Sequence, residues 1–320
     1  MFHSINKNLN IQLFFLVLLF GWAGWTIFTQ MAPMPTDGSM LLYQEVSKLW
    51  SWNPTFTRIL VLIMVFLMTF GVIQHSLKNH FAENRSYMPG VFFLLMLNCG
   101  KFLQRFTPAL LSVFFITLIL LLYSPNEQAS KMKDRLFDFG FLIAIATLLD
   151  ISAFGIALFL ILMVAINNVT SFKDIVILLS GISFPYIFAF SISFIANGLP
   201  TFVQSWRDVN VYVPIKQFTQ MQVIEYVAAA AFLTVSIILM IRDKRLMDNK
   251  LIVIRQAFNN VNLLMISMLL FLFLGIVPLP AALIYLLPSV ALYMSVAVTQ
   301  KRYRYVMDVL IVGLCVLLWL

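Results

Sequence analysis

Long apolar blocks alternate with short polar segments along most of the chain, and many of the blocks approach the roughly 20 residues that a helix needs to cross a bilayer. This pattern predicts an all-α, polytopic membrane helix bundle with about 11 transmembrane helices, organised as a single integral membrane domain over residues 1–320. The predicted spans cover residues 11–28, 59–75, 88–100, 108–123, 137–149, 151–166, 175–196 and 223–241, the two segments that flank residues 277–280, and residues 305–320.

Composition excludes a soluble protein. The chain is 62% hydrophobic and 11% charged, whereas soluble domains average about 45–50% apolar and about 25% charged residues. So few charges cannot solvate the surface of a soluble fold of 320 residues. Residues 11–28 follow Lys7 and precede no Ala-x-Ala-like cleavage site, so we interpret them as a retained helix rather than a signal peptide.

The distribution of Lys and Arg predicts the orientation. With the N-terminus inside, the loops between predicted spans hold 15 of the 21 Lys and Arg residues on the inner side and 6 on the outer side. Because positively charged loops stay in the cytoplasm, we expect the N-terminus inside and the C-terminus outside. The same rule explains the net charge of +8, so the expected partners are membrane lipids and not nucleic acid.

Two predicted spans, residues 88–100 and 137–149, are too short for a straight helix to cross the hydrocarbon core. Polar residues follow each of them, among them Lys101 after the first and Asp150 after the second. A locally thin bilayer is one explanation. The other is a water-filled outer cavity, where polar groups at this depth are hydrated.

The first outer loop combines an acidic residue with an amphipathic segment, residues 40–52. The predicted apolar face of this segment consists of Leu42, Val46, Leu49 and Trp50. The pattern predicts a helix on the bilayer surface that ends before Pro54. Asp37 lies just ahead of it, where a carboxylate is suited to act as a general base toward a hydroxyl or to hold a divalent cation. Alternatively, Asp37 caps a helix that begins at Ser39 or Met40.

Four more polar residues are candidates for an outer site. Asp150 is either a second catalytic acid or the cap of the next helix. Lys101, Arg105 and Arg207 are cations on the side that is otherwise poor in them. They suit the phosphate of a lipid-linked substrate, which Arg can bind through two parallel hydrogen bonds. Alternatively, each extends to lipid headgroups at the interface.

The sequence predicts no resident cofactor and no metal centre built from histidine or cysteine. His3, His75 and His80 lack ligand spacing, and Cys99 and Cys315 lie within apolar segments. The sequence also lacks a Gly-rich phosphate loop and the His-Glu-x-x-His and Gly-x-Ser-x-Gly motifs. A divalent cation held by Asp37 is therefore the one metal that the residues suggest.

The order of these features resembles the membrane half of the GT-C superfamily, glycosyltransferases that use lipid-phosphate-linked sugars. Residues 35–43, Pro-Thr-Asp-Gly-Ser-Met-Leu-Leu-Tyr, resemble the first outer loop of that superfamily, residues 89–123 its third and fourth helices, and residues 137–166 the following hairpin. The resemblance implies a GT-C-like module over residues 11–196, followed by additional membrane helices over residues 197–320. Gly38 stands where the superfamily often has a second acid beside the first.

A second resemblance rests on Arg135-Leu136-Phe137-Asp138 and the hairpin after it. Through these residues the chain resembles an uncharacterised family of multi-pass membrane proteins of similar length from Bacteroidota. That resemblance implies a place in the bacterial inner (plasma) membrane and carries no activity.

Three functions remain open on these residues. The first is a GT-C-like glycosyltransferase, or a degenerate relative, that acts on a polyprenyl-phosphate-linked sugar at the outer face through Asp37 and Asp150. The second is a transporter or flippase of a lipid or an anion, although the spans lack the internal repeat that many transporters carry. The third is a non-enzymatic membrane subunit that binds protein partners in an envelope assembly. The sequence does not decide whether the chain is an enzyme.

Overall fold

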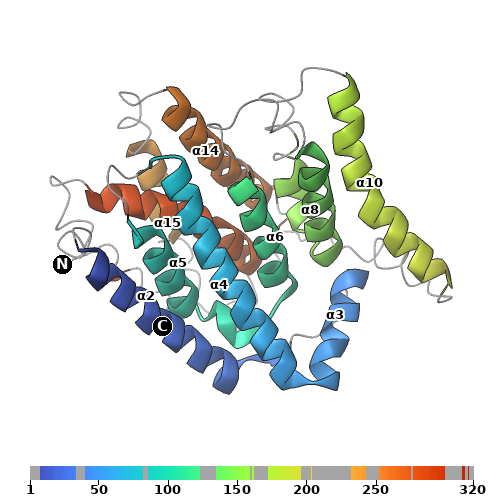
Figure 1. The fold of residues 1–320 in the computed structure, drawn as a ribbon, viewed down its shortest axis with the longest axis horizontal. Helices are drawn as coiled ribbons and strands as arrows, with labels where there is room; N and C mark the ends of the chain where they lie inside the picture. The colour runs from blue at the N-terminus through green and yellow to red at the C-terminus, as the bar shows by residue number, and fades with distance from the viewer. Residues whose placement is uncertain are drawn as a thin grey trace.

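The computed structural model is a bundle of helices (Figure 1). It describes residues 8–33, 40–81, 86–122, 135–158, 161, 172–195, 203, 232–242, 252–274, 277–299, 312–313 and 316. Within these residues the chain is helical, apart from short connections and one pair of two-residue strands. The predicted all-α class is therefore confirmed.

The helices follow the predicted apolar blocks. They are α2 (Leu9–Gln30), α3 (Leu41–Trp52), α4 (Pro54–Lys78), α5 (Met88–Cys99), α6 (Pro108–Leu122), α8 (Leu136–Leu149), α10 (Phe172–Ile195), α14 (Ile252–Phe273) and α15 (Leu279–Thr299). A further helix, Phe232–Arg242, lies between α10 and α14 in the sequence. Strands β1 (Ala32–Pro33) and β2 (Arg105–Phe106) and the 3-10 turn η1 (Phe102–Gln104) lie in the connections.

Five helical segments are long and apolar enough to cross a membrane, namely α2, α4, α10, Ile254–Phe273 of α14 and Leu279–Val298 of α15. Among the described residues, α5, α6, α8 and Phe232–Arg242 are shorter apolar helices. This set of helices is that of a multi-pass membrane protein. Predicted spans 151–166, 223–241 and 305–320 fall wholly or partly outside the described residues. The number of spans and the orientation stay predictions.

The corner between α3 and α4 is built as the sequence predicts. Helix α3 ends at Trp52, and Pro54 occupies the first turn of α4, where its missing N–H costs nothing. Asn53 caps α4, because its side-chain oxygen accepts a hydrogen bond from the Phe56 N–H at 3.0 Å. The two helices therefore meet at a sharp corner, visible at the lower edge of Figure 1.

The short strands join two segments that are far apart in the sequence. Strand β1, after α2, pairs in parallel with β2, before α6, with Ala32 opposite Arg105 and Pro33 opposite Phe106. Near the pair, the Gln104 side chain donates to the Gln30 side chain at 3.0 Å. We call this end of the bundle, where α2 and α5 end and α4 and α6 begin, the sheet end. It corresponds to the predicted outer side.

Helix α15 is enclosed by other helices. All 18 residues from Ala281 to Val298 are buried. It packs against α5, α6, α14 and α4 and crosses the bundle behind α4 and α5 in Figure 1. Tyr293 donates to the Asn262 side chain of α14 and Ser295 to a carbonyl oxygen of its own helix, whereas the buried Ser289 hydroxyl has no partner in the described structure.

Helix α10 lies at the edge of the bundle (Figure 1) and packs closely on α8. Two glycines allow this contact. A Cβ on Gly140 of α8 would overlap with the Leu178 carbonyl oxygen, and a Cβ on Gly181 of α10 would overlap with the Phe137 carbonyl oxygen. The backbones thus touch at this crossing, which is how small residues bring membrane helices together.

Candidate functional site at the sheet end

The sheet end holds Lys101 and Arg105, two described cations of the predicted outer site. The β1–β2 pair places Arg105 directly beside Ala32, where the first outer loop begins. The Arg105 side chain is exposed, whereas Phe106 is completely buried. This alternation fits a short strand whose two faces meet different surroundings. The pairing thus brings the start of the first outer loop next to Arg105, while the grouping of the predicted site residues stays a prediction.

Tyr43 fixes helix α3 to this strand. Its hydroxyl donates to the Phe106 carbonyl oxygen at 2.6 Å, and its side chain is completely buried. Burial raises the pKa of Tyr43 to about 12, so the hydroxyl stays a neutral donor at physiological pH. The Phe106 ring also lies 5.9 Å from the rings of Tyr43 and Trp50. Helix α3 is therefore docked onto the bundle, against α4 and α8, rather than resting on the bilayer by its apolar face alone.

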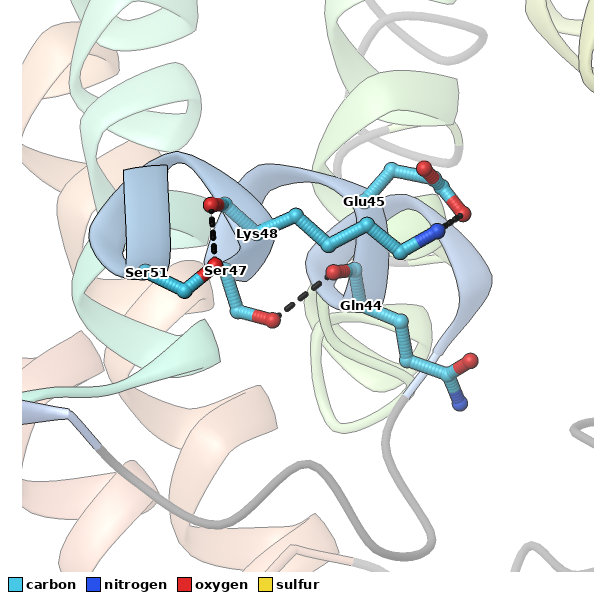
Figure 2. A network of polar contacts seen from close by, with 5 residues as sticks. All are labelled: Gln44, Glu45, Ser47, Lys48 and Ser51. Carbon is cyan, nitrogen blue, oxygen red and sulfur yellow. Dashed lines mark hydrogen bonds and ion pairs between the residues drawn. The ribbon is translucent and has the colours of Figure 1, made fainter. Parts of the chain in front are cut away.

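The polar face of α3 points away from the bundle, as predicted (Figure 2). Lys48 pairs with Glu45 at 2.6 Å, and both side chains are exposed. The hydroxyls of Ser47 and Ser51 donate to carbonyl oxygens one turn earlier, at 2.7 Å each. These contacts are local to the helix, so this face offers no cluster of converging groups for a substrate.

Arg58 joins the site from the first turns of α4. Its guanidinium carbon lies 5.5 Å from the centre of the Trp50 ring, a cation–π contact. Its Nε is shielded from solvent and has no hydrogen-bond partner. By its place in the sequence, Arg58 is one of the six cations on the predicted outer side, and nothing in the sequence shows that Trp50 lies under it.

Lys101 and Arg105 both reach the surface of the sheet end and are separated by the η1 turn. Lys101 adopts a left-handed backbone conformation with φ of 55°, which is rare for a residue with a side chain. It stands directly after α5, so the left-handed residue helps turn the chain into η1 and β2. The role of Lys101 and Arg105 in binding a phosphate stays a prediction.

Asp150 lies within the bundle, with a relative exposure of 7%. One carboxylate oxygen accepts from the Tyr285 hydroxyl of α15 at 2.7 Å, and the other from the Ser152 N–H at 2.9 Å. The Ser112 hydroxyl of α6 donates to the Ala146 carbonyl oxygen of α8 at 2.9 Å. These bonds tie α8, α6 and α15 together. The bond from the Ser152 N–H also fits the alternative in which Asp150 caps the next helix, while its catalytic role stays a prediction.

Asp37 and Arg207 lie outside the described residues. Helix α3 begins at Leu41, with Met40 at its N-cap position. Across the described ranges, no three His, Cys, Asp or Glu side chains come together as metal ligands. A divalent cation at Asp37 therefore stays a prediction from the sequence.

Comparison of the chain with protein-family models, with curated proteins and with solved structures finds no match. The two family resemblances seen in the sequence are thus neither supported nor opposed by these comparisons. The functional argument consequently rests on the residues and on the geometry of the sheet end.

Proposed function

We propose that the chain is a GT-C-like glycosyltransferase, or a relative of one, that acts on a polyprenyl-phosphate-linked sugar at the sheet end. The observation that carries this proposal is the β1–β2 pair. It joins Ala32, from which the chain leads on to Asp37, to Arg105, which is the proposed phosphate-binding cation. A transferase of this kind needs both groups at one membrane surface.

In this proposal each residue has a distinct task. Asp37 is the general base or the ligand of a divalent cation. Arg105, Lys101 and Arg207 bind the lipid phosphate, and Arg105 is placed to do so because its side chain is exposed beside β1. Asp150 supports the site from within, through its bond to Tyr285. The lipid tail lies among the apolar helices, which keeps the reacting sugar at the interface.

The test is sugar transfer by the purified full-length chain from a labelled polyprenyl-phosphate-linked sugar. Asp37→Asn should lower the rate by about 100-fold or more, since general acid–base groups contribute on that order. Asp138→Asn is the matched control, because Asp138 is an exposed acid in the first turn of α8, far along the helix from the sheet end. Its rate should equal that of the wild type.

The same experiment separates the alternatives. Full transfer activity in Asp37→Asn would remove the proposed role of this residue. Movement of the labelled lipid across vesicles without transfer of the sugar would instead identify a flippase. A chain that does neither, and that co-purifies with a stoichiometric partner when Asp37 and Asp150 are both replaced, would be a membrane subunit.

A further inference from the structure

Three hydroxyl groups lie along one side of α15, the helix that other helices enclose. Tyr285, Ser289 and Tyr293 follow one another at intervals of four residues, so each lies about one turn beyond the last. All three side chains have a relative exposure of 0%. We call these three residues the hydroxyl stripe. Polar groups are costly inside a membrane protein, so a row of them on an enclosed helix points to a function.

The stripe begins at the sheet end. The Tyr285 hydroxyl donates to the carboxylate of Asp150, the residue that follows α8. The Ser112 hydroxyl, near the start of α6, donates to the Ala146 carbonyl oxygen at 2.9 Å. Because α6 begins at the sheet end, this bond places the last turn of α8, and Asp150 with it, at that end.

The stripe leads to the opposite end of the bundle. Tyr293 donates to the Asn262 side chain of α14, and its ring centre lies 5.0 Å from that of Phe258. The Phe258 ring in turn lies 5.9 Å from Phe81, which follows the end of α4. Asn262 is 6% exposed and Asp150 is 7% exposed, so both ends of the stripe come closer to solvent than its middle.

Ser289, in the middle of the stripe, has a buried hydroxyl with no hydrogen-bond partner in the described structure. Its neighbour Pro288 has no N–H and cannot donate to the Ile284 carbonyl oxygen one turn earlier. One turn of α15 thus holds an unbonded hydroxyl and a carbonyl oxygen that lacks its usual helical donor. A buried water satisfies such groups, because it makes about three hydrogen bonds to polar atoms that are otherwise unpaired.

We propose that the hydroxyl stripe binds water at Ser289 and conducts protons between the two ends of the bundle. A proton on this water passes to the Tyr285 oxygen while the Tyr285 hydroxyl proton passes to Asp150, which releases a proton at the sheet end. Tyr293 links the water to the opposite end in the same way. Only O–H bonds form and break, and the hydroxyls then rotate back. This proposal does not rest on the proposed transferase activity.

The chemistry of the stripe fits a proton better than a larger ion. Each hydroxyl both donates and accepts hydrogen bonds, which is what the transfer of a proton from group to group requires. A metal ion needs several oxygen ligands that converge on one point. Across the described ranges, no three His, Cys, Asp or Glu side chains converge in this way. Complete burial of the stripe also fits, because a proton moves along hydrogen bonds and needs no open channel.

The first experiment measures proton uptake by lipid vesicles that contain the purified full-length chain. A pH-sensitive dye inside the vesicles reports the uptake, and a potassium diffusion potential drives it. Vesicles with the wild-type chain should take up protons faster than protein-free vesicles. Ser289→Ala should lower the rate roughly tenfold, because the bound water loses one of its hydrogen-bonding groups. Tyr293→Phe should lower it as well, since phenylalanine neither donates nor accepts a hydrogen bond.

Ser295→Ala is the matched control. Ser295 is a buried hydroxyl of the same helix, but it lies outside the stripe and donates to the Leu292 carbonyl oxygen at 2.7 Å. Its rate should equal that of the wild type. Equal rates in the wild type, Ser289→Ala and Tyr293→Phe would overturn the proposal, as would wild-type uptake no faster than in protein-free vesicles. Should Ser289→Ala fail to fold, Tyr293→Phe decides alone.

Cysteine labelling tests the bound water without any transport. In a chain that carries Cys99→Ala and Cys315→Ala, Ser289→Cys should react with a small water-soluble methanethiosulfonate roughly tenfold faster than Ala291→Cys, because a thiol forms its reactive thiolate where water solvates it. Ala291 is equally buried, and two residues along a helix place it on a different side of α15. Equally slow labelling of both variants would show that the stripe is dry, which contradicts the proposal.

Discussion

Helices α10 and α15 are alike in sequence and opposite in surroundings. Both are apolar, of membrane-spanning length, and interrupted by one proline. Yet α15 is enclosed on all sides over residues 281–298, whereas most of α10 is exposed at the edge of the bundle (Figure 1). Apolar character therefore shows that a helix is suited to a membrane. It does not show whether lipid or protein surrounds the helix.

What separates the two helices is the kind of side chain they carry. Helix α10 exposes large residues that lipid covers well, such as Phe184, Phe188 and Phe194. Helix α15 instead has few exposed side chains, and its buried hydroxyls of Tyr285 and Tyr293 bond to Asp150 and Asn262, whereas Tyr186 of α10 bonds to Thr147 from a half-buried position. Because lipid tails are as apolar as the helices themselves, packing and hydrogen bonds decide which helix lies inside.

The strongest test of this contrast replaces one leucine in each helix. Leu286→Ala in α15 should lower the free energy of unfolding by about 3 kcal/mol, because the completely buried side chain leaves a cavity. Leu179→Ala in α10 should cost less than about 0.5 kcal/mol, because this side chain is 52% exposed and lipid fills the space. Detergent titration in mixed micelles, followed by circular dichroism, measures both. Equal losses would show that α10 is also enclosed.

A second test addresses the contact that holds α10. Gly181→Val should lower the free energy of unfolding by about 2 kcal/mol, because the new side chain pushes the backbones of α8 and α10 apart. Gly21→Val in α2 is the control, since a Cβ at Gly21 meets nothing within 4 Å. The same titration applies. A stable Gly181→Val variant would mean that the two helices need not touch.

The smallest expected loss in the free energy of unfolding comes from removing one tyrosine hydroxyl in each helix. Tyr285→Phe should cost about 1.5 kcal/mol, because the lost bond is made to a buried carboxylate. Tyr186→Phe in α10 should cost about 0.5 kcal/mol, because Thr147 keeps its bonds to carbonyl oxygens of its own helix. A larger loss from Tyr186→Phe than from Tyr285→Phe would reverse the expected ranking.

Helix α3 shows which features the local pattern of apolar and polar residues can predict. Its existence, its end before Pro54 and its exposed polar face followed from helical spacing and from proline chemistry. The contact of Tyr43 did not follow from this pattern, since the completely buried residue bonds to Phe106, 63 positions away. A contact with so distant a residue does not affect the spacing of apolar and polar residues around Tyr43, so the local sequence does not reveal it.

In the candidate site, too, some features followed from the sequence and others appeared only in the structure. Charge and position identified Arg105 and Lys101 as cations of one surface, and the structure places both at the sheet end. The pairing of Ala32 with Arg105 had no local signal, because two-residue strands are too short to show an alternating pattern. Asp150 was recognised as an unusual acid near the membrane, but its bond to Tyr285 of α15 could not be foreseen.

The sequence by itself determined that this chain is a multi-pass membrane protein, because hydropathy and helix length depend on each residue and its near neighbours alone. It also determined where α3 and α4 meet, since Asn53 and Pro54 act within one turn. The tertiary structure alone decided that α15 is enclosed, that β1 meets β2 and that Arg58 lies over Trp50. Each of these features joins segments that are distant in the chain, and their contacts exist only after the helices have packed.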